Sequence, residues 1–349
     1  MKIKSFLGPI VMNTLNGISM GVIVALIPGA LVNQLIKFLL PSFPQLAFIT
    51  TLTSLAALLL PMTSAACVGM VGKLSPIHTA ALILAAVAGA GNFHFTKTGF
   101  QAQGSGDVIN LALTIFLGYL LLELIGSRLQ AYTILLVPLI VLVVAGGTGS
   151  LTLQPVSQIA QGIGIIINQF NTLQPVLMSV LMAIAFAFLI VSPISSVGIA
   201  TAIGINGLAA GAANLGIVAA SFALAIYGWK ANSVGTSLAH FLGSPKIQMA
   251  NLIKRPRLFL PILLNAGIAG GIGSFFQITG TPLSAGFGFS GLIGPLVALE
   301  GFHNNTWLNI GIIVLNFLIL PITLSLVSNY LWQRKLHYFQ ASDFALNYE

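Results

Sequence analysis

The sequence predicts an all-α integral membrane protein that crosses the bilayer about eight to ten times, and three observations support this. Of the 349 residues, 57% are hydrophobic and 5% are charged, whereas about a quarter of the residues of a soluble domain are charged. No Asp, Glu, Lys, Arg or His occurs between Arg128 and Lys230. Apolar windows long enough to span hydrocarbon, about 20 residues, recur along nearly the whole chain. Most of the chain is therefore expected to lie in lipid.

Nine apolar segments are candidate spans, and Gly-rich stretches that enter and leave the membrane on one side account for the range in the number of crossings. The N-terminal run has the basic front of a signal peptide, but Asn13 and Asn16 interrupt it and no small-residue cleavage site follows. We expect this run to be retained as the first span. The nine segments are 9–36, 45–72, 76–91, 108–127, 131–147, 174–192, 210–228, 258–278 and 307–332.

The formal net charge of +8 is explained by membrane topology and does not require a nucleic-acid partner. Basic residues concentrate in cytoplasmic loops of membrane proteins. Here they precede the first span, fill one acid-free connection and follow the last span. We therefore expect both termini to face the cytoplasm, with an even number of full crossings. The residues are Lys2, Lys4, Lys230, Lys246, Lys254, Arg255, Arg257, Arg334 and Lys335.

Residues 151–172 differ from an ordinary span. Val156, Ile159 and Ile163 recur at helical spacing, while Gln154 and Gln158 take other faces. This pattern predicts an amphipathic helix lying along the membrane interface. A buried helix with a polar seam is the alternative.

Two Gly-rich apolar segments, 192–217 and 279–295, are predicted to be broken, re-entrant hairpins. Glycine in a helix interior costs about 1 kcal/mol relative to alanine, and irregular backbone at membrane depth survives only inside protein or beside a wet cavity. Transporters use such broken segments to form substrate sites. Close packing of continuous helices through small residues is the alternative.

The five acids narrow the search for reactive groups. Asp343 and Glu349 belong to the tail and are expected to be solvated, and Glu123 is expected to pair with Arg128. Asp107, in the polar loop before an apolar segment, is either a helix N-cap or an acceptor for a substrate hydroxyl. Glu300 closes the second Gly-rich segment, either at the surface or as a functional acid at membrane depth.

No metal site, cofactor site or hydrolase triad is predicted. The histidines are scattered without metal-ligand spacing, and the single Cys67 lies in an apolar stretch. His240 follows the first Gly-rich segment and either lines a site or is structural. Because charge is scarce and Asn, Gln, Ser and Thr are abundant, the expected substrate is a neutral hydroxylated solute such as a sugar or polyol. The candidate binding residues are Asp107, Asn110, Asn206, Asn214, His240 and Glu300.

Several passages together resemble one family. They are NGISMGVIVALIPGAL, GSGDVINLALT, TLQPVLMSVLMAIAFAFLIVSPISS, GLAAGAANLGI, KIQMANLIKRPRLFLPILLNAGIAGG and GFGFSGLIGP, in one order between about residues 10 and 335. Their succession is similar to the PfoR-like branch of the enzyme IIC proteins of the bacterial phosphoenolpyruvate-dependent sugar phosphotransferase system.

The resemblance implies a homodimeric inner-membrane protein surrounded by lipid, with a scaffold part, a transport part and broken hairpins. It divides the chain into 1–150 (scaffold), 151–172 (amphipathic helix), 173–335 (transport) and 336–349 (cytoplasmic tail). It also implies that a separate IIB protein, charged by IIA, phosphorylates the sugar, and that a carboxylate and a histidine hold the reacting hydroxyl. The Glu-containing substrate motif of the better-known sugar branches is absent from the Gly-rich hairpins. Asp107 or Glu300 is left as the carboxylate.

Two other functions fit the same sequence. One is a membrane sensor or regulator that keeps the fold without transport, because the PfoR-like branch is also described as regulatory. The other is an exporter or facilitator that works without phosphorylation. As a IIC subunit, the chain would form part of a sugar phosphotransferase only together with IIB.

Overall fold

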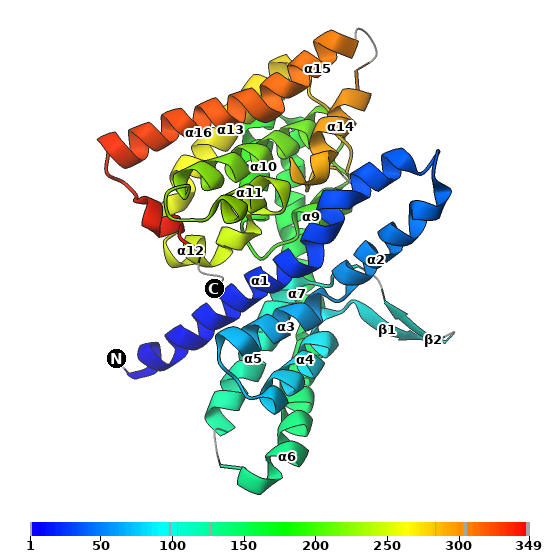
Figure 1. Ribbon diagram of the computed structural model, residues 1–349, viewed down its shortest axis with the longest axis vertical. Coiled ribbons are helices and arrows are strands. Elements are labelled where there is room, and N and C mark those ends of the chain that lie inside the picture. The colour runs from blue at the N-terminus through cyan, green and yellow to red at the C-terminus, as the bar shows by residue number, and fades with distance from the viewer. Residues whose placement is uncertain are drawn as a thin grey trace. The chain divides into compact units, whose positions relative to one another are not determined.

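The computed structural model describes residues 2–97, 99–102, 104–125, 128–282, 284–302 and 306–346, and most of them are helical (Figure 1). Six helical stretches are long and apolar enough to cross a membrane, or seven if the bent pair 44–58 and 60–71 is one span. Three shorter apolar helices accompany them. All nine predicted segments fall on helices, so the predicted all-α polytopic membrane class is confirmed. The six stretches are Phe6–Gly29, Val108–Ile125, Gln130–Thr172, Gly207–Tyr227, Pro256–Phe275 and Trp307–Lys335.

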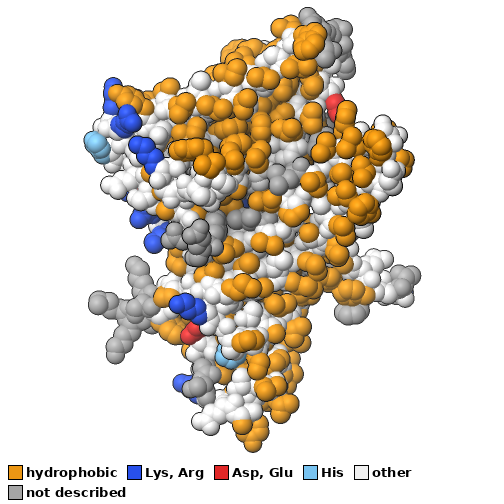
Figure 2. Space-filling view, viewed as in Figure 1, with side chains coloured by type: hydrophobic (Ala, Val, Ile, Leu, Met, Phe, Trp, Pro, Cys, Tyr) orange, Lys and Arg blue, Asp and Glu red, His pale blue; other side chains and the backbone are white. Residues whose placement is uncertain are grey.

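Exposed apolar side chains agree with a lipid environment. Figure 2 shows hydrophobic side chains spread over most of the visible face, with charged groups confined to a few places. Leu151 and Trp307 are 82% and 84% exposed. In water such surfaces would drive aggregation, whereas in lipid they are the expected outer face.

The described chain forms two units, of which unit 1 comprises residues 1–29 and 36–159 and unit 2 comprises 30–35 and 160–349. The boundary lies inside a helix, and the finer division expected from the sequence stays a prediction. The elements of unit 1 are α1 Lys2–Leu39, η1 Pro44–Leu46, α2 Ala47–Leu58, α3 Leu60–Val71, α4 Pro76–Ala90, β1 Phe93–Thr96, β2 Gly99–Ala102, α5 Val108–Ile125, η2 Gln130–Tyr132, α6 Thr133–Ile140, η3 Val141–Gly146 and the start of α7 Gly147–Asn168.

In unit 1, α4 contacts α3, α5, α6 and η3. The polar loop before α5 contains a short antiparallel hairpin, β1–β2, in which Phe93 stacks on Phe100. Close helix approach is possible because Gly89 and Gly149 face each other beside Thr114.

Residues 151–172 are not a separate helix. The chain runs from α6 through a π-helical turn, η3, directly into α7 and the short η4 Gln169–Thr172. Pro155 is accommodated inside α7. One face of α7 is exposed, including Leu151, Ile159 and Ile166, so the amphipathic pattern belongs to the second half of a long continuous helix.

Unit 2 is built around α10 Gly207–Tyr227, whose residues from Ala209 onward are almost all buried. It packs against α8, α13, α16 and α11. The other elements are α8 Pro175–Ile190, α9 Ser196–Ile203, α11 Val234–Leu242, η5 Pro245–Gln248, α12 Met249–Lys254, η6 Pro256–Leu258, α13 Phe259–Phe275, η7 Ser290–Leu292, α14 Ile293–Glu300, α15 Thr306–Val314, η8 Leu315–Ile319, α16 Leu320–Asn329, η9 Tyr330–Lys335 and η10 Ala341–Phe344.

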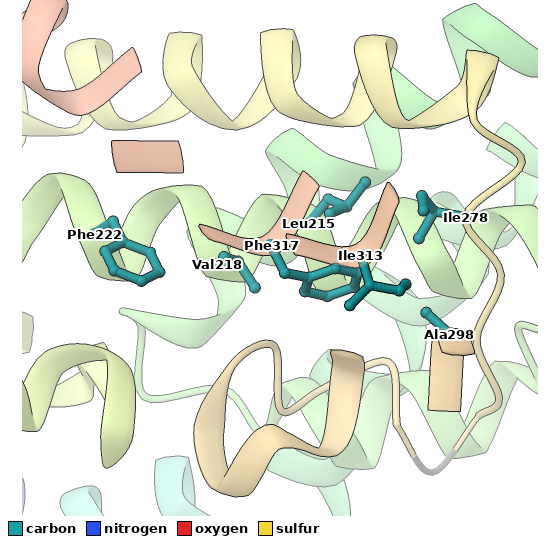
Figure 3. Close-up of a cluster of buried hydrophobic side chains, with 7 residues drawn as sticks. All are labelled: Leu215, Val218, Phe222, Ile278, Ala298, Ile313 and Phe317. Carbon is teal, nitrogen blue, oxygen red and sulfur yellow. The ribbon is translucent and has the colours of Figure 1, made fainter. Parts of the chain in front are cut away.

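Two features let α10 pack so closely. Gly216 lies directly against the backbone of Ala183 in α8, and Gly211 lies against the carbonyl of Ile278. Farther along, Phe317 of η8 packs on α10 within a buried apolar cluster (Figure 3). The cluster consists of Leu215, Val218, Phe222, Ile278, Ala298, Ile313 and Phe317. Small residues thus serve close packing here, as the alternative interpretation of the first Gly-rich segment proposed.

The tail after η9 is folded onto unit 2. The Phe344 carbonyl accepts hydrogen bonds from Asn232 Nδ2 (2.9 Å) and Gln248 Nε2 (2.7 Å). Phe339 and Phe344 pack on the ring of Tyr227. Asp343 forms an ion pair with Arg255, so the expectation of a solvated Asp343 is wrong. Glu349 lies outside the described residues.

The expected ion pair between Glu123 and Arg128 is not formed in the described part of the chain. Among the described residues, the ion pair joins Arg255 to Asp343 and does not involve Glu123 or Arg128. Glu123 is exposed instead.

Substituting Gly216 with alanine should destabilise unit 2, because a Cβ atom there overlaps the backbone of Ala183. Overpacking of this kind costs about 1–3 kcal/mol, and we expect a lower unfolding midpoint in detergent. Gly235→Ala is the matched control, since no neighbouring segment lies within 4 Å of the place that a Cβ atom would take there. Equal midpoints for the two variants would contradict the close contact between α8 and α10.

Candidate functional site

Three breaks between the helices of unit 2, each taken with the first residues of the helix that follows, are tied to one another around α10, and together they form the candidate site. They are the break between α8 and α9 with Ser196 (192–196), the turn after α11 with the start of η5 (243–246) and the segment between α13 and η7 with Ser290 (279–290, of which 283 lies outside the described residues). We call this set the junction. Each pair of breaks is joined by hydrogen bonds from side chains to backbone carbonyls.

The first break is held from both sides. Ser196 Oγ donates to the Gly286 carbonyl of the third break at 2.9 Å. Lys246 Nζ, from the second break, donates to the carbonyls of Ser192 (2.6 Å) and Ile194 (2.7 Å). These bonds satisfy carbonyls that no helix partner can reach.

The second and third breaks are joined directly. Ser290 Oγ donates to the Gly243 carbonyl at 2.6 Å, and both atoms are buried. The three breaks are thus linked in a closed triangle of side-chain-to-backbone contacts.

Asn214 fixes the third break to α10. Its Nδ2 donates to Ser284 Oγ (3.2 Å), and its Oδ1 accepts from the Gly288 amide (3.1 Å). The side chain is fully buried. Gly288 has φ of 62°, a conformation that a side chain would strain, and it lies directly against Ile217. Asn214 therefore has a positional role toward the backbone of the third break.

The start of α10 is paired with the same break. Gly207 and Gly280 exchange two backbone hydrogen bonds of 3.0 Å each. Asn206, which is exposed, caps α10 by accepting from the Gly207 amide at 2.9 Å. The positive end of the α10 dipole therefore lies beside the third break.

Glu300 is brought to the edge of the junction. It is the last residue of α14 and is exposed. The next residue, Gly301, lies against the hydroxyl of Thr279. Of the six predicted residues, Asn214 is bonded to the third break, whereas Asn206 and Glu300 are next in sequence to glycines that contact it.

His240 lies on α11 and is fully buried. Its Nδ1 is 2.9 Å from the Thr236 carbonyl and 3.1 Å from the Ser237 carbonyl, and its Nε2 is 3.1 Å from Gln248 Nε2. The Nδ1 atom therefore carries the proton and Nε2 accepts. Burial lowers the pKa of His240 to about 4. The ring links α11 to η5 as a neutral group.

The two remaining predicted residues lie in unit 1. Asp107 Oδ1 accepts from the amides of Ile109 and Asn110, which is the N-cap arrangement for α5. The buried Asn110 donates to the Gly89 and Gly149 carbonyls and accepts from Thr152. Both side chains have structural partners that account for their positions.

The junction contains no acidic side chain among the described residues. Each acid in the described part of the chain lies outside it, at Asp107, Glu123, Glu300 and Asp343. Within the described residues no group of three His, Cys, Asp or Glu side chains could hold a metal ion. His303, three residues after Glu300 in the sequence, lies outside the described residues. The junction contains hydroxyl groups, amides, backbone carbonyls and one ammonium. Groups of these kinds form hydrogen bonds with the hydroxyls of a neutral solute.

Six helical stretches among the described residues are long and apolar enough to span a bilayer, as in an integral membrane protein with multiple spans. A family model described as "Phosphotransferase system, EIIC" matches residues 12–346. The chain therefore belongs to this family, the membrane subunits of sugar transport, and is a multi-pass inner-membrane protein. No curated protein and no solved structure matches the chain. The PfoR-like branch stays a prediction.

Sequence reasoning missed the residues that tie the junction together. Lys246 was assigned to a basic cytoplasmic connection, although it is buried. Its position in GSPKIQ, where Gly and Pro mark a turn, was the one sequence feature that set it apart from the other basic residues of this connection. Ser192, Ser196, Ser284 and Ser290 carry no pattern that separates them from other serines.

The stability of the protein should fall between pH 6.5 and pH 4 because of His240. Its pKa is about 4 in the folded protein and 6.5 when unfolded, so the unfolded chain binds the proton first. The stabilisation is complete above pH 6.5 and is lost as the pH falls through 4. Unfolding midpoints measured across this range should decline in the wild type and decline less in His240→Asn. His337→Asn, on an exposed residue, is the control that should decline like the wild type.

Proposed function

We propose that the chain carries a neutral sugar or polyol through unit 2 and presents it to a separate IIB protein for phosphorylation. The observation that carries the proposal is the junction, in which broken backbone, neutral side chains and the Lys246 ammonium are held together without any described carboxylate. Ionic substrates call for a fixed counter-charge, whereas hydroxyls are bound by paired donors and acceptors. Asn206 and the backbone of the third break are the proposed binding groups, and Asn214 holds that backbone in place.

Glu300 is the proposed carboxylate for the reacting hydroxyl. The residue after it, Gly301, lies against Thr279 of the third break, whereas Asp107 and Asn110 have partners in unit 1. In the proposed step the sugar oxygen attacks the phosphorus held by the IIB cysteine. The phosphorus–sulfur bond breaks, the cysteine leaves as thiolate, and Glu300 accepts the hydroxyl proton. A general base of this kind contributes about 10²–10⁴-fold to rate.

The basic end of unit 2 is the proposed docking face for IIB. The tail joins the basic connection that contains Arg257 to the basic end of the last span, Arg334 and Lys335. The Tyr338 hydroxyl donates to the Arg257 carbonyl, and the Arg257 guanidinium lies 5.8 Å from the centre of the Tyr338 ring. Figure 2 shows Lys and Arg side chains gathered at this end of unit 2. Basic residues favour the cytoplasmic side, so the C-terminus and the IIB face are proposed to share that side. The dimer implied by the family resemblance belongs to the same proposal.

The test is uptake into vesicles that contain the purified protein, with a panel of radiolabelled sugars and polyols and with or without phosphorylated IIB. Sugar phosphate should accumulate only when phosphorylated IIB is present. Glu300→Gln should lower the rate by about 10²-fold or more, and Asn214→Ala should reduce sugar binding. Asp107→Asn is the control and should keep the uptake of the folded protein.

Accumulation of sugar phosphate that Glu300→Gln and Asp107→Asn both leave intact would remove the carboxylate assignment. Uptake that is independent of phosphorylated IIB would indicate a facilitator. Absence of binding to every sugar, together with altered transcripts on deletion of the gene, would indicate a regulator.

A further inference from the structure

Lys246 is a buried cation that the proposed transport step does not use. It is 7% exposed, and the ion pair found among the described residues joins Arg255 to Asp343 and leaves Lys246 without an acid. Burying an ammonium costs several kcal/mol unless it is well hydrogen-bonded. In agreement with this cost, burial lowers its pKa to about 7.

The partners of Lys246 explain what the buried charge achieves. Its Nζ donates to the Ser192 and Ile194 carbonyls, which follow the last turn of α8. Carbonyls at a helix C-terminus carry partial negative charge and attract cations. Hydrogen bonds within the same turn also stabilise it, since the Ser192 hydroxyl donates to the Leu189 carbonyl and accepts from the Ile194 amide. Lys246 therefore adds a clamp, that is, hydrogen bonds from another segment, to a turn that is already compact.

The other end of the clamp is equally fixed. The Lys246 amide donates to Ser244 Oγ, which caps the η5 turn. Two residues on, Gln248 Nε2 is bonded to the Phe344 carbonyl and contacts His240. The η5 turn cannot shift without breaking these bonds, so Lys246 transmits its position to the first break.

The first break in turn meets the third break, where Ser196 donates to Gly286 and Gly286 lies against the backbone of Val197. Gly286 and Gly288 belong to the segment proposed for solute binding. The Gly288 amide donates to Asn214 Oδ1. A displacement of the Ser192–Ile194 turn would therefore move the backbone that the solute contacts.

We propose that Lys246 is a positioning residue of the solute site, which fixes the break between α8 and α9 through the Ser192 and Ile194 carbonyls and thereby sets the geometry of the 279–290 segment. This inference rests on the proposed transport function. Lys246 acts through the backbone and not on the solute itself.

The experiment compares Lys246→Met, Lys246→Arg and Lys246→Gln with Lys254→Met, an exposed lysine on α12. Counterflow in vesicles is measured with labelled D-glucose, N-acetyl-D-glucosamine and D-mannitol, without IIB. Hydrogen exchange of the peptide covering 190–200 is measured on the same preparations, with unfolding midpoints as a check on folding.

Lys246→Met should raise KM for the transported probe about tenfold or more, because a misplacement of about 1 Å is sufficient to cost up to 100-fold. The 190–200 peptide should exchange faster, and both effects should be absent in Lys254→Met. Lys246→Arg keeps the charge and the donors and should recover most of the affinity. Should Lys246→Met fail to fold, Lys246→Gln, which keeps a donor but loses the charge, replaces it in the comparison with Lys246→Arg.

Wild-type KM in a folded Lys246→Met or Lys246→Gln protein would overturn the proposal. A uniform loss of midpoint without a rise in KM would also overturn it, since that is the signature of a purely structural lysine. If the wild type transports none of the three probes, the proposed transport of these solutes fails, and the exchange rates alone decide the clamp. Faster exchange of residues 190–200 supports it, and unchanged exchange rejects it.

Discussion

Every backbone polar group inside a membrane protein must find its partner within the protein, because lipid offers none. Helices meet this requirement automatically, but the breaks at 192–196, 243–246 and 279–290 do not. Their carbonyls are satisfied by Ser196, Ser290 and Lys246. These side chains, together with local backbone hydrogen bonds, stabilise irregular backbone in unit 2. Because they link one break to another, they hold the three breaks together around α10.

The same constraint shapes the chemistry. A site built from broken backbone offers amides, carbonyls and short hydroxyls, and the acids of the described chain lie elsewhere. Such groups suit the neutral hydroxylated solute that we propose as substrate. The one buried cation, among the described residues of the junction, holds backbone carbonyls. In the proposed function this charge positions the backbone, a partner supplies the phosphoryl group, and Glu300 accepts the proton.

Hydropathy predicted the membrane class and the position of every apolar segment, because length and composition decide whether a helix can span a bilayer. Glycine content was less informative. It predicted irregular backbone throughout 192–217, but residues from Gly207 onward form one continuous helix. There Gly211 and Gly216 admit neighbouring backbone, and the packing gained outweighs the low helix propensity of glycine.

The candidate site was predictable only in part. Asn206, Asn214 and Glu300 are candidates because of their places beside Gly-rich segments. Asn214 hydrogen-bonds to the third break, Asn206 precedes the glycine that pairs with Gly280, and Gly301, next to Glu300, contacts Thr279. Asp107 and Asn110 looked equivalent in sequence, but their partners are contributed by α4, α5 and α7 of unit 1. The burial of Lys246 was not predictable from the positive-inside rule. That rule places basic residues in cytoplasmic loops but does not predict which of them are exposed. Contacts between residues so distant in sequence cannot be derived from local pattern.

The junction itself is tested most directly by joining two of its breaks. In a Cys67→Ser background, Gly243→Cys and Ser290→Cys introduce thiols where the Ser290 hydroxyl meets the Gly243 carbonyl. A short thiol-specific cross-linker applied to native membranes should join them efficiently, detected by mass spectrometry of the linked peptides. The pair Gly235→Cys and Ser290→Cys, with Gly235 at the other end of α11, should link far less. Equal or absent linking of the first pair would contradict a junction in which the breaks are tied together.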